Sequence, residues 1–470
     1  NKITRIDFEN VIAKLKSLGF TAINSSGSYH LNIQNQYIDQ RSGRTNMSNI
    51  RTTVEGLKNI QDYCKTNSVL DTTTDQPYNH IKFMQKKKKI HGDDRFDTIH
   101  YDNFGFRINY KDEIIMKTQF GIVKDLLNSW DEKKKIFRLL KRFTFTHPNY
   151  ALNIDLSVVR TSTMSRGKMI PEFRIESSNI FKNPETYEIE IEVDKSRLPF
   201  IIDINEREDK LVRAINYSIK QNIKYVLSGL QESNYPISND ESYGILEEYI
   251  HVLHKHPPDR SIRTRDFVGP SSISLELNNV AHLEGDAKTP NIRNPYTITE
   301  KADGLRKLLF INRKGKVYLI DTNMKVQFTG IKTTKNIYFN SILDGEHVLH
   351  DKKKNFINYY LAFDIYYINK KDVRSNAFYK KTEDGRIGRL IELNKLIKNV
   401  DFEPFIGDNL PLKVRVKDFH YSDSHTDNIF ENCRTILERV DEGQYEYETD
   451  GLIFTTAHTG VVSNREGEVL

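Results

Sequence analysis

The stretch YEIEIEVD, residues 187–194, alternates strictly between apolar and acidic residues. Successive side chains of a β-strand point to opposite faces, so this pattern predicts a strand with one apolar face and one face of carboxylates. Two interpretations of the acidic face are open. It is exposed to solvent, or it holds a hard cation such as Mg²⁺ or Mn²⁺, which prefers carboxylate oxygens. In the second case Glu188, Glu190 and Glu192 are metal ligands.

Further short alternating runs precede this stretch, at residues 104–114, 135–145 and 152–159. Such runs, joined by Asn, Pro and Gly turns, predict an antiparallel sheet or barrel. Their polar positions include Arg107, Arg142 and Asp155. Each arginine taken alone is typical of a surface. A barrel with carboxylates on one wall and arginines on another, however, could hold a metal-bound triphosphate.

Helical spacing of apolar residues predicts helices over residues 6–18, 52–63 and 211–227, and residues 231–242 have the composition of a linker. In the second half, strands dominate residues 296–367, and the basic turn at 313–316 predicts a hairpin. A helix is expected near residues 245–253 and another at 388–399, with further strands up to residue 454. The pattern as a whole favours an α+β fold.

The composition excludes several classes of protein. Lys and Arg number 70 and Asp and Glu 64, so the net charge of +6 tolerates a polyanion without demonstrating nucleic-acid binding. No uncharged apolar run of about 18 residues is present, which argues against a membrane protein. Two cysteines, Cys64 and Cys433, cannot form a disulfide framework or a four-cysteine zinc site. The chain begins without Met or a signal peptide, and we expect it to be part of a longer protein.

The strongest chemical signal is EKADGLR, residues 300–306. A single K-x-D-G is common by chance, but LDGE (343–346), YLAFDIYY (360–367) and TDGLIF (449–454) follow it in order, each among apolar residues. A lysine amine can attack the α-phosphate of a nucleoside triphosphate and form a phosphoramidate, which divides one difficult transfer into two easier ones. Lys301 is therefore the candidate nucleophile.

Together these four elements resemble the covalent nucleotidyltransferases, the superfamily of mRNA guanylyltransferases and polynucleotide ligases. By match to the family motifs, Arg306 and Glu346 would hold the ribose, Phe363 would stack on the base, and Asp450 would coordinate the metal. Asp303 belongs to the same nucleotide-binding motif as Lys301. The segment FVGPSSISLE, residues 267–276, resembles one that precedes the lysine motif in viral capping enzymes, which favours guanylyl transfer over ligation.

The N-terminal half carries a second resemblance. The strand of Glu188, Glu190 and Glu192, with IDLSVVR (154–160) and LKRF (140–143), is similar to the triphosphate tunnel metalloenzymes, specifically the RNA 5′-triphosphatase domain of mRNA capping enzymes of large DNA viruses. The resemblance adds Arg160 to the candidate catalytic residues, although it is out of phase with Asp155 along the strand. In that family a second glutamate pair lies on the first tunnel strand, and we expect it upstream of residue 1.

We therefore expect two domains. Residues 1–215 would form an antiparallel β tunnel or barrel that removes the γ-phosphate of 5′-triphosphate RNA. Residues 216–470 would form a nucleotidyltransferase domain of mixed antiparallel sheets with helices, without the family's C-terminal oligonucleotide-binding lobe. This domain would transfer GMP from GTP to the 5′-diphosphate end through Lys301, with Mg²⁺ or Mn²⁺. The alternatives are an ATP-dependent polynucleotide ligase and a catalytically weak scaffold.

The resemblance also implies partners and a location. They are the 5′ end of nascent mRNA, GTP, a viral RNA polymerase and a cap methyltransferase domain or subunit, with no membrane. The expected location is the cytoplasm of the host cell, at the site of viral replication, or the virion.

Overall fold

The computed structural model describes residues 2–39, 42–69, 80–88, 90–91, 94–95, 97–198, 208–254, 259–282, 290–379, 387–423 and 428–461. The chain divides into two compact units, Asn1–Glu232 and Ser233–Leu470. The expected boundary between residues 215 and 216 falls inside helix α5, Glu208–Gln231, which belongs to the first unit.

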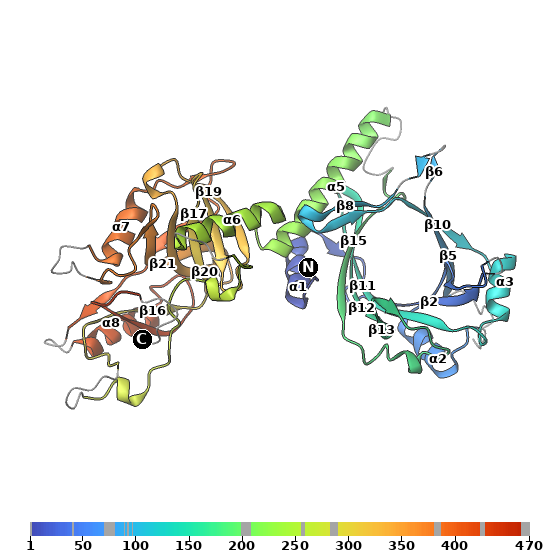
Figure 1. Ribbon diagram of the computed structural model, residues 1–470, viewed down its shortest axis with the longest axis horizontal. Helices are drawn as coiled ribbons and strands as arrows, with labels where there is room; N and C mark the ends of the chain where they lie inside the picture. The colour runs from blue at the N-terminus through green and yellow to red at the C-terminus, as the bar shows by residue number, and fades with distance from the viewer. Residues whose placement is uncertain are drawn as a thin grey trace. The chain divides into compact units, whose positions relative to one another are not determined.

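The N-terminal unit is built on a strongly curved antiparallel sheet (Figure 1). Its strands follow the order β10–β5–β4–β2–β11–β12–β15, and in the described part of the chain no pairing joins β10 to β15. The sheet is therefore an open half-barrel, which confirms the predicted α+β class and tunnel-like antiparallel architecture. The strands of this path are β2 (Ser28–Ile38), β4 (Ile50–Glu55), β5 (Ile81–Lys88), β10 (Lys111–Met116), β11 (Lys135–His147), β12 (Tyr150–Thr161) and β15 (Thr186–Val193).

Shorter strands extend or flank this sheet. Two of them pair with its strands, β1 (Thr21–Ala22) with β11 and β3 (Thr45–Met47) with β2. The others form small hairpins, namely β6 (Ile90–His91) with β7 (Asp94–Arg95), β8 (Ile99–Tyr101) with β9 (Phe106–Ile108), and β13 (Met164–Ser165) with β14 (Lys168–Met169). Short 3-10 turns occur at Asp102–Phe104 and Glu176–Ser178.

Helices cover the convex face of the sheet (Figure 1). The helix α1 (Arg5–Ser17) begins with a capping box in which Thr4 and Asp7 bond each other's backbone N–H. It buries Phe8, Val11 and Leu15 against α5 and β12. At the crossing of α1 and α5, a Cβ on Gly229 would lie 2.7 Å from the Cα of Val11, so only glycine permits this approach. Elsewhere on this face, α2 (Leu57–Thr66) and α3 (Gly121–Asn128) enclose a second core.

Two predicted elements of this unit are wrong. The sequence predicts one helix over residues 52–63, but the β-branched run Thr52, Thr53 and Val54 is buried in strand β4, and α2 begins only after Gly56 at φ +90°. One strand is predicted over 104–114, but β9 and β10 pair with different partners, β8 and β5. Arg107 therefore lies on the exposed β8–β9 hairpin, apart from the curved sheet.

The C-terminal unit contains an eight-stranded sheet in the order β22–β21–β20–β17–β18–β19–β23, with β24 pairing parallel to β21. The run Leu308 to Ile311 is buried on both faces of this sheet, because α6 (Asn239–Leu253) packs on one side and α7 (Arg389–Asn399) on the other. The strands are β17 (Leu305–Ile311), β18 (Lys316–Asp321), β19 (Val326–Lys332), β20 (Ser341–His350), β21 (Phe356–Ile368), β22 (Lys371–Asp372), β23 (Glu403–Pro404) and β24 (Lys413–Val416).

A second, three-stranded sheet in this unit has the order β25–β16–β26. Its strands are β16 (Tyr296–Ala302), β25 (His420–Ser422) and β26 (Thr449–Thr456), and helix α8 (Ile429–Asp441) packs on β16. Short 3-10 turns occur at Thr264–Asp266, Leu277–Asn279 and Asn336–Tyr338. The predicted hairpin at residues 313–316 joins β17 to β18, as expected. Across the described ranges of both units, no helix is long and apolar enough to cross a membrane.

Candidate functional site

Lys301 lies at an irregularity in strand pairing. In the β16–β26 ladder Glu300 pairs with Leu452 and Ala302 with Thr449, so Lys301 faces two residues, Asp450 and Gly451. Such a bulge bends the strand and redirects a side chain. The Lys301 Nζ donates a hydrogen bond to Asp450 Oδ2 at 2.5 Å, and both side chains are about half exposed, 47% and 50%. The amine is thus accessible to a ligand and is held next to a carboxylate.

Arg306 is held firmly beside this lysine strand, on β17. Its Nε and Nη2 donate to the two oxygens of Asp344, at 3.2 and 2.6 Å, and its Nη1 donates to the Pro270 carbonyl at 2.6 Å. Asp344 is fully buried and also accepts a hydrogen bond from the Tyr366 hydroxyl at 2.6 Å. The guanidinium therefore has a fixed direction, as a bidentate pair imposes.

Glu346 pairs with Arg306 across the β17–β20 ladder. Burial raises the pKa of Glu346 to about 7, and the ammonium group of Lys417 acts in the opposite direction. Phe363 occupies a bulge on the next strand, because Asp344 pairs with Asp364 and Gly345 with Ala362, which leaves the ring without a partner residue in the ladder. The structure thus places Arg306, Glu346 and Phe363 on three adjacent strands.

Two other acidic residues belong to these motifs, the predicted Asp303 and Asp364, which lies in the element YLAFDIYY. Asp303 is exposed, and its backbone N–H donates to the Glu448 carbonyl at 2.9 Å, which ties the turn after Lys301 to β26. Asp364 points away from the site and forms a buried ion pair with Arg389, with N–O distances of 2.9 and 3.1 Å.

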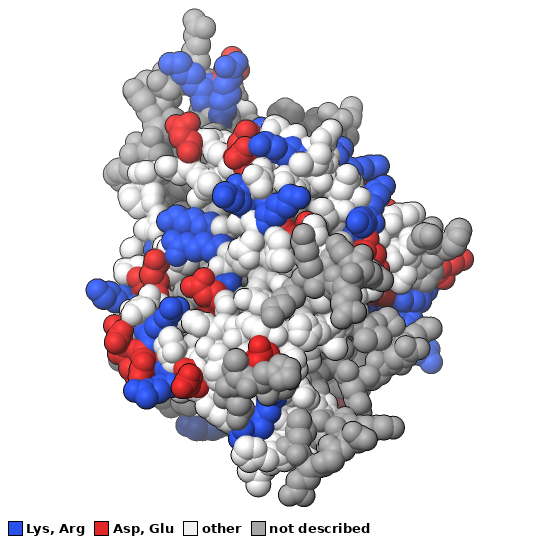
Figure 2. Space-filling view, turned by 90° about the vertical axis from the view of Figure 1, so that its left-hand side faces the viewer, with Lys and Arg blue, Asp and Glu red and all other residues white. Residues whose placement is uncertain are grey.

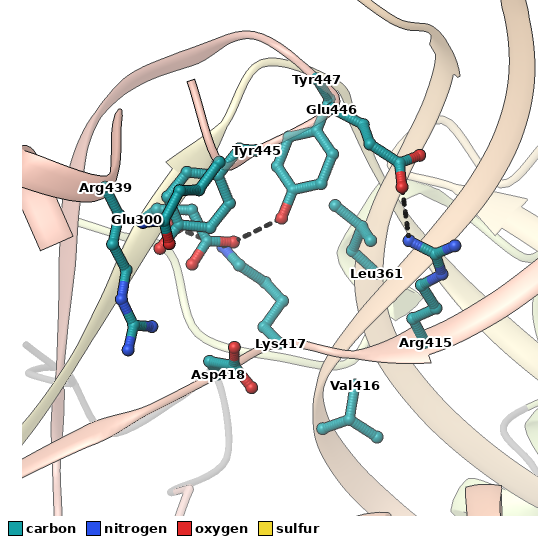
Figure 3. Close-up of a pocket in the computed structure, with 11 residues that line it drawn as sticks. Glu300, Leu361, Arg415, Val416, Lys417, Asp418, Arg439, Tyr445, Glu446 and Tyr447 are labelled. Carbon is teal, nitrogen blue, oxygen red and sulfur yellow. Dashed lines mark hydrogen bonds and ion pairs between the residues drawn. The ribbon is translucent and has the colours of Figure 1, made fainter. Parts of the chain in front are cut away.

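A cavity of about 220 Å³ is lined by Glu300, the residue before Lys301 on β16 (Figure 3). Because successive side chains of a strand alternate, the cavity lies on the face of β16 opposite Lys301. Glu300 is buried there and accepts a hydrogen bond from the Tyr447 hydroxyl at 2.8 Å. Lys417 is also buried and bonds the Glu300 backbone carbonyl; burial lowers the pKa of its ammonium group. Across the cavity Arg415 pairs with Glu446 (Figure 3). The sequence interpretation missed these residues, although the alternation in KVRVK, residues 413–417, could have indicated a strand with a basic face.

In the N-terminal unit the charged candidates face the concave side of the curved sheet, opposite the helices. Asp155 pairs with Glu190, and Ser157 with Glu188, across β12 and β15. Arg142 bridges two of these acids, with Nη1 2.8 Å from Asp155 and Nη2 2.9 Å from Glu190. The structure therefore brings Arg142 and the predicted carboxylates together.

One further ion pair and one further carboxylate belong to this concave cluster. Arg138 forms an ion pair with Glu188. Glu192 lies within the curve of the sheet, where burial raises the pKa of its carboxyl and the negative charges of Asp155 and Glu190 raise it further. Within the described residues no group of three or more His, Cys, Asp or Glu side chains is arranged closely enough to hold a metal ion.

Two predicted residues lie outside the concave cluster. Arg107 is on the β8–β9 hairpin, and Arg160 points to the opposite face of β12, where it donates to Glu185 at 3.0 Å and to the Phe181 carbonyl at 2.6 Å. The structure confirms that Asp155 and Arg160 point to opposite faces of β12, because the ladder with β11 runs from one to the other without a bulge.

Arg51 on β4 also faces the concave side and was missed. Its Nη2 donates to the Met84 sulfur at 3.2 Å, and its buried Nε has no hydrogen-bond partner among the described residues. The nearby charges include Glu113, Arg142 and Glu190, and burial lowers the pKa of the guanidinium. Because a helix was predicted over residues 52–63, strand β4 was not recognised, and Arg51 was not considered as a residue of the sheet.

The surface charge agrees with the balanced composition. On the face of the molecule drawn in Figure 2, basic and acidic side chains are interspersed. This distribution fits the small net charge of +6.

Comparison with known proteins gives a consistent result. Residues 234–470 match the family model described as mRNA capping enzyme, catalytic domain. A probable mRNA-capping enzyme of Acanthamoeba polyphaga mimivirus is 24% identical over 335 residues, which cover 71% of this chain and 23% of the relative. An mRNA-capping enzyme of Danio rerio is 28% identical over 199 residues, 40% of this chain and 29% of the relative. The chain thus spans about a quarter of the length of these curated relatives.

A solved structure of the S. pombe Pct1 RNA triphosphatase is also similar, at 13% sequence identity and a TM-score of 0.24, covering 47% of this chain and 67% of that one.

Proposed function

The chain belongs to the mRNA capping enzyme family, whose catalytic domain matches its residues 234–470, and from this premise we propose that it transfers GMP from GTP to the 5′-diphosphate end of RNA through Lys301. The observation that carries the proposal is the accessible Lys301 amine, held 2.5 Å from Asp450 opposite a bulge in β26.

The reaction has two balanced steps. The Lys301 Nζ loses a proton and attacks the α-phosphorus of GTP; the N–P bond forms, the α–β phosphoanhydride bond breaks, and pyrophosphate leaves. A terminal oxygen of the RNA diphosphate then attacks the same phosphorus and releases the lysine. Asp450 is hydrogen-bonded to the amine and orients it. Arg306 and Glu346 would hold the ribose and Phe363 would stack on the guanine, by match to the family motifs.

A divalent cation, Mg²⁺ or Mn²⁺, is implied by the family. Asp450 offers it a half-exposed carboxylate, an oxygen donor of the kind these ions prefer, so the site fits the ion. When bound, the cation neutralises charge on the phosphates.

Incubation of the chain with radiolabelled GTP or ATP tests this proposal. We expect covalent label from GTP that is stable to denaturation and absent from Lys301→Ala, while Lys314→Ala, which removes an exposed lysine from the β17–β18 turn, retains it. Label from ATP alone would identify a ligase instead. Label that survives in Lys301→Ala would refute the choice of nucleophile, and a folded chain that takes no label would be the scaffold alternative.

For the N-terminal unit we propose hydrolysis of the γ-phosphate of 5′-triphosphate RNA on the concave face. The support is the cluster of Arg138, Arg142 and the carboxylates that they contact, with Arg51 beside it. The carboxylates Glu188, Glu190, Glu192 and Asp155 are hard oxygen donors on one face, the donor type that Mg²⁺ and Mn²⁺ prefer, but no three of the described acids lie close enough together to hold the ion as they stand. The arginines would neutralise the phosphate oxygens.

The test compares Glu190→Gln with Glu185→Gln, whose carboxylate pairs with Arg160 outside the concave cluster. We expect Glu190→Gln to lose phosphate release from triphosphate-ended RNA and to keep GMP labelling, and Glu185→Gln to keep both. Phosphate release at the original rate from Glu190→Gln would refute the assignment.

As partners we propose a viral RNA polymerase and a cap methyltransferase, and as location the host cytoplasm or the virion. The support for a viral setting is that one relative is a probable mRNA-capping enzyme of a virus. Co-purification from infected cells, with an unrelated viral protein as control, tests these associations.

A further inference from the structure

We propose that the segment Phe267–Pro270 is a positioning element for Arg306, and that Gly269 is the residue on which its action depends. The inference rests on the proposed function, in which Arg306 contacts the ribose of GTP. The segment has no regular secondary structure, and it lies 36 residues before the arginine that it contacts.

The contact is direct and comes from two sides. The Pro270 carbonyl accepts a hydrogen bond from Arg306 Nη1 at 2.6 Å, and the Phe267 ring lies under the guanidinium at 5.4 Å from its centroid. Asp344 holds Nε and Nη2. An arginine has five N–H donors in a rigid fork, and three of them are therefore engaged by Asp344 and Pro270. Because the guanidinium is rigid, its two remaining N–H donors also point in fixed directions. The side chain is therefore pre-organised to donate to a ligand hydroxyl.

Gly269 is necessary for this approach. Its φ is +129°, a backbone conformation that residues other than glycine rarely adopt. A Cβ at this position would lie 2.5 Å from Arg306 Nη2, 2.9 Å from the Tyr366 hydroxyl and 3.0 Å from Asp344 Oδ2. Any larger residue would push the guanidinium away from both of its acceptors.

The segment is itself anchored to the core of the unit. Tyr249 on α6 is fully buried, and its hydroxyl donates to the Asp266 carbonyl at 2.8 Å and accepts from the Val268 N–H at 2.9 Å. The Asp266 side chain accepts from both Nη atoms of Arg260, at 2.8 and 2.5 Å. These contacts fix the backbone on either side of Phe267. They therefore also fix the position of the Pro270 carbonyl that accepts from Arg306.

The experiment measures selectivity for the ribose in lysyl–GMP formation by the full chain. The values of kcat and KM are determined for GTP, 2′-deoxy-GTP and 3′-deoxy-GTP in the original protein, in Gly269→Ala and in Gly407→Ala. Gly407 is a matched control because it also has a positive φ, +81°, but a Cβ there would contact nothing within 4 Å. A second variant, Tyr249→Phe, loosens the anchor without touching Arg306 and answers the question if Gly269→Ala does not fold.

We expect the original protein to prefer GTP over at least one deoxy analogue, and Gly269→Ala to lose about tenfold of that preference, as expected for one hydrogen bond to a charged group. The loss should appear in KM, with kcat for GTP nearly unchanged, and Tyr249→Phe should act in the same direction. The proposal fails if a folded variant weakens GTP and both analogues equally, if its selectivity is unchanged, or if the original protein shows no selectivity. Absence of any lysyl–GMP in the original protein would instead refute the proposed function.

Discussion

The two units place their functional charges in different ways. On the concave face of the N-terminal sheet, Arg142 and the carboxylates Asp155 and Glu190 follow the simple alternation of strands and neutralise one another across neighbouring strands. In the C-terminal unit Lys301 and Phe363 lie at β-bulges, and Asp364 is buried with its arginine partner. The ion pairs of Arg142 on the concave face are partly open to solvent, whereas the Asp364–Arg389 pair is buried in the core of its unit.

The largest effect expected from this difference is on stability, in the variant Asp364→Ala. It leaves Arg389, which is 2% exposed, as an uncompensated buried charge. Breaking a buried pair in this way typically costs about 3–5 kcal/mol of the free energy of unfolding. Urea denaturation followed by far-UV circular dichroism measures the loss, and Asp408→Ala, an exposed acid in the same unit, serves as control.

The same experiment separates the two units. Trp130 is the only tryptophan of the chain and is buried in the N-terminal unit, so its fluorescence follows that unit alone. We expect the Trp130 transition to be unchanged in Asp364→Ala while the C-terminal transition moves to lower urea. An equal shift of both transitions would contradict the view that each unit carries its own charge network.

The contrast between alternation and bulges also explains what the sequence could predict. Alternation alone identified the acidic face of β15 and placed Arg142 opposite it, because period two survives in any regular strand. The motifs predicted Lys301, Arg306, Glu346 and Asp450. The structure places Lys301 beside Asp450 on the paired strands β16 and β26, and Arg306 opposite Glu346 on the paired strands β17 and β20.

Other features could not be predicted, for identifiable reasons. Arg51 was not predicted as a residue of the sheet, because a helical pattern of apolar residues overlaps strand β4, whose residues are largely β-branched. Arg107 was misplaced because residues 109–110, which have no regular structure, divide one apparent strand into β9 of a small hairpin and β10 of the curved sheet. Contacts between distant segments, such as Pro270 with Arg306, have no signature in local pattern at all.

An intermediate effect is expected from Glu346, which lies between the two extremes because it is partly buried. Burial raises the pKa of its carboxyl from 4.5 to about 7 in the folded chain. The folded state therefore keeps its proton to a higher pH than the unfolded state does. The resulting stabilisation is complete below pH 4.5 and is lost as the pH rises to about 7, a change on the order of 2–3 kcal/mol.

Comparison with Glu346→Gln, which cannot ionise, isolates this contribution. Between pH 5 and pH 8 the free energy of unfolding of the C-terminal unit should fall more steeply in the original chain than in Glu346→Gln. Parallel pH profiles would show that Glu346 is ionised throughout and is more exposed to water than its position on β20 indicates.

The smallest effect is expected on the concave face of the N-terminal unit, where Arg142→Ala is compared with Arg160→Ala. Both arginines are on the β11–β12 hairpin and both pair with acids, but Arg142 contacts Asp155, whose side chain is only 6% exposed, whereas Arg160 contacts the exposed Glu185. Removal of Arg142 leaves Asp155 with the Thr144 hydroxyl, which donates to it at 2.6 Å, so the cost should be about 1–2 kcal/mol. Removal of Arg160 should cost less than about 1 kcal/mol, as is usual for exposed pairs.

Urea denaturation followed by Trp130 fluorescence measures the free energy of unfolding of both variants. If Arg142→Ala proved as costly as Asp364→Ala, the concave cluster would be a buried network like that of the C-terminal unit, and the distinction between the two kinds of placement would not hold.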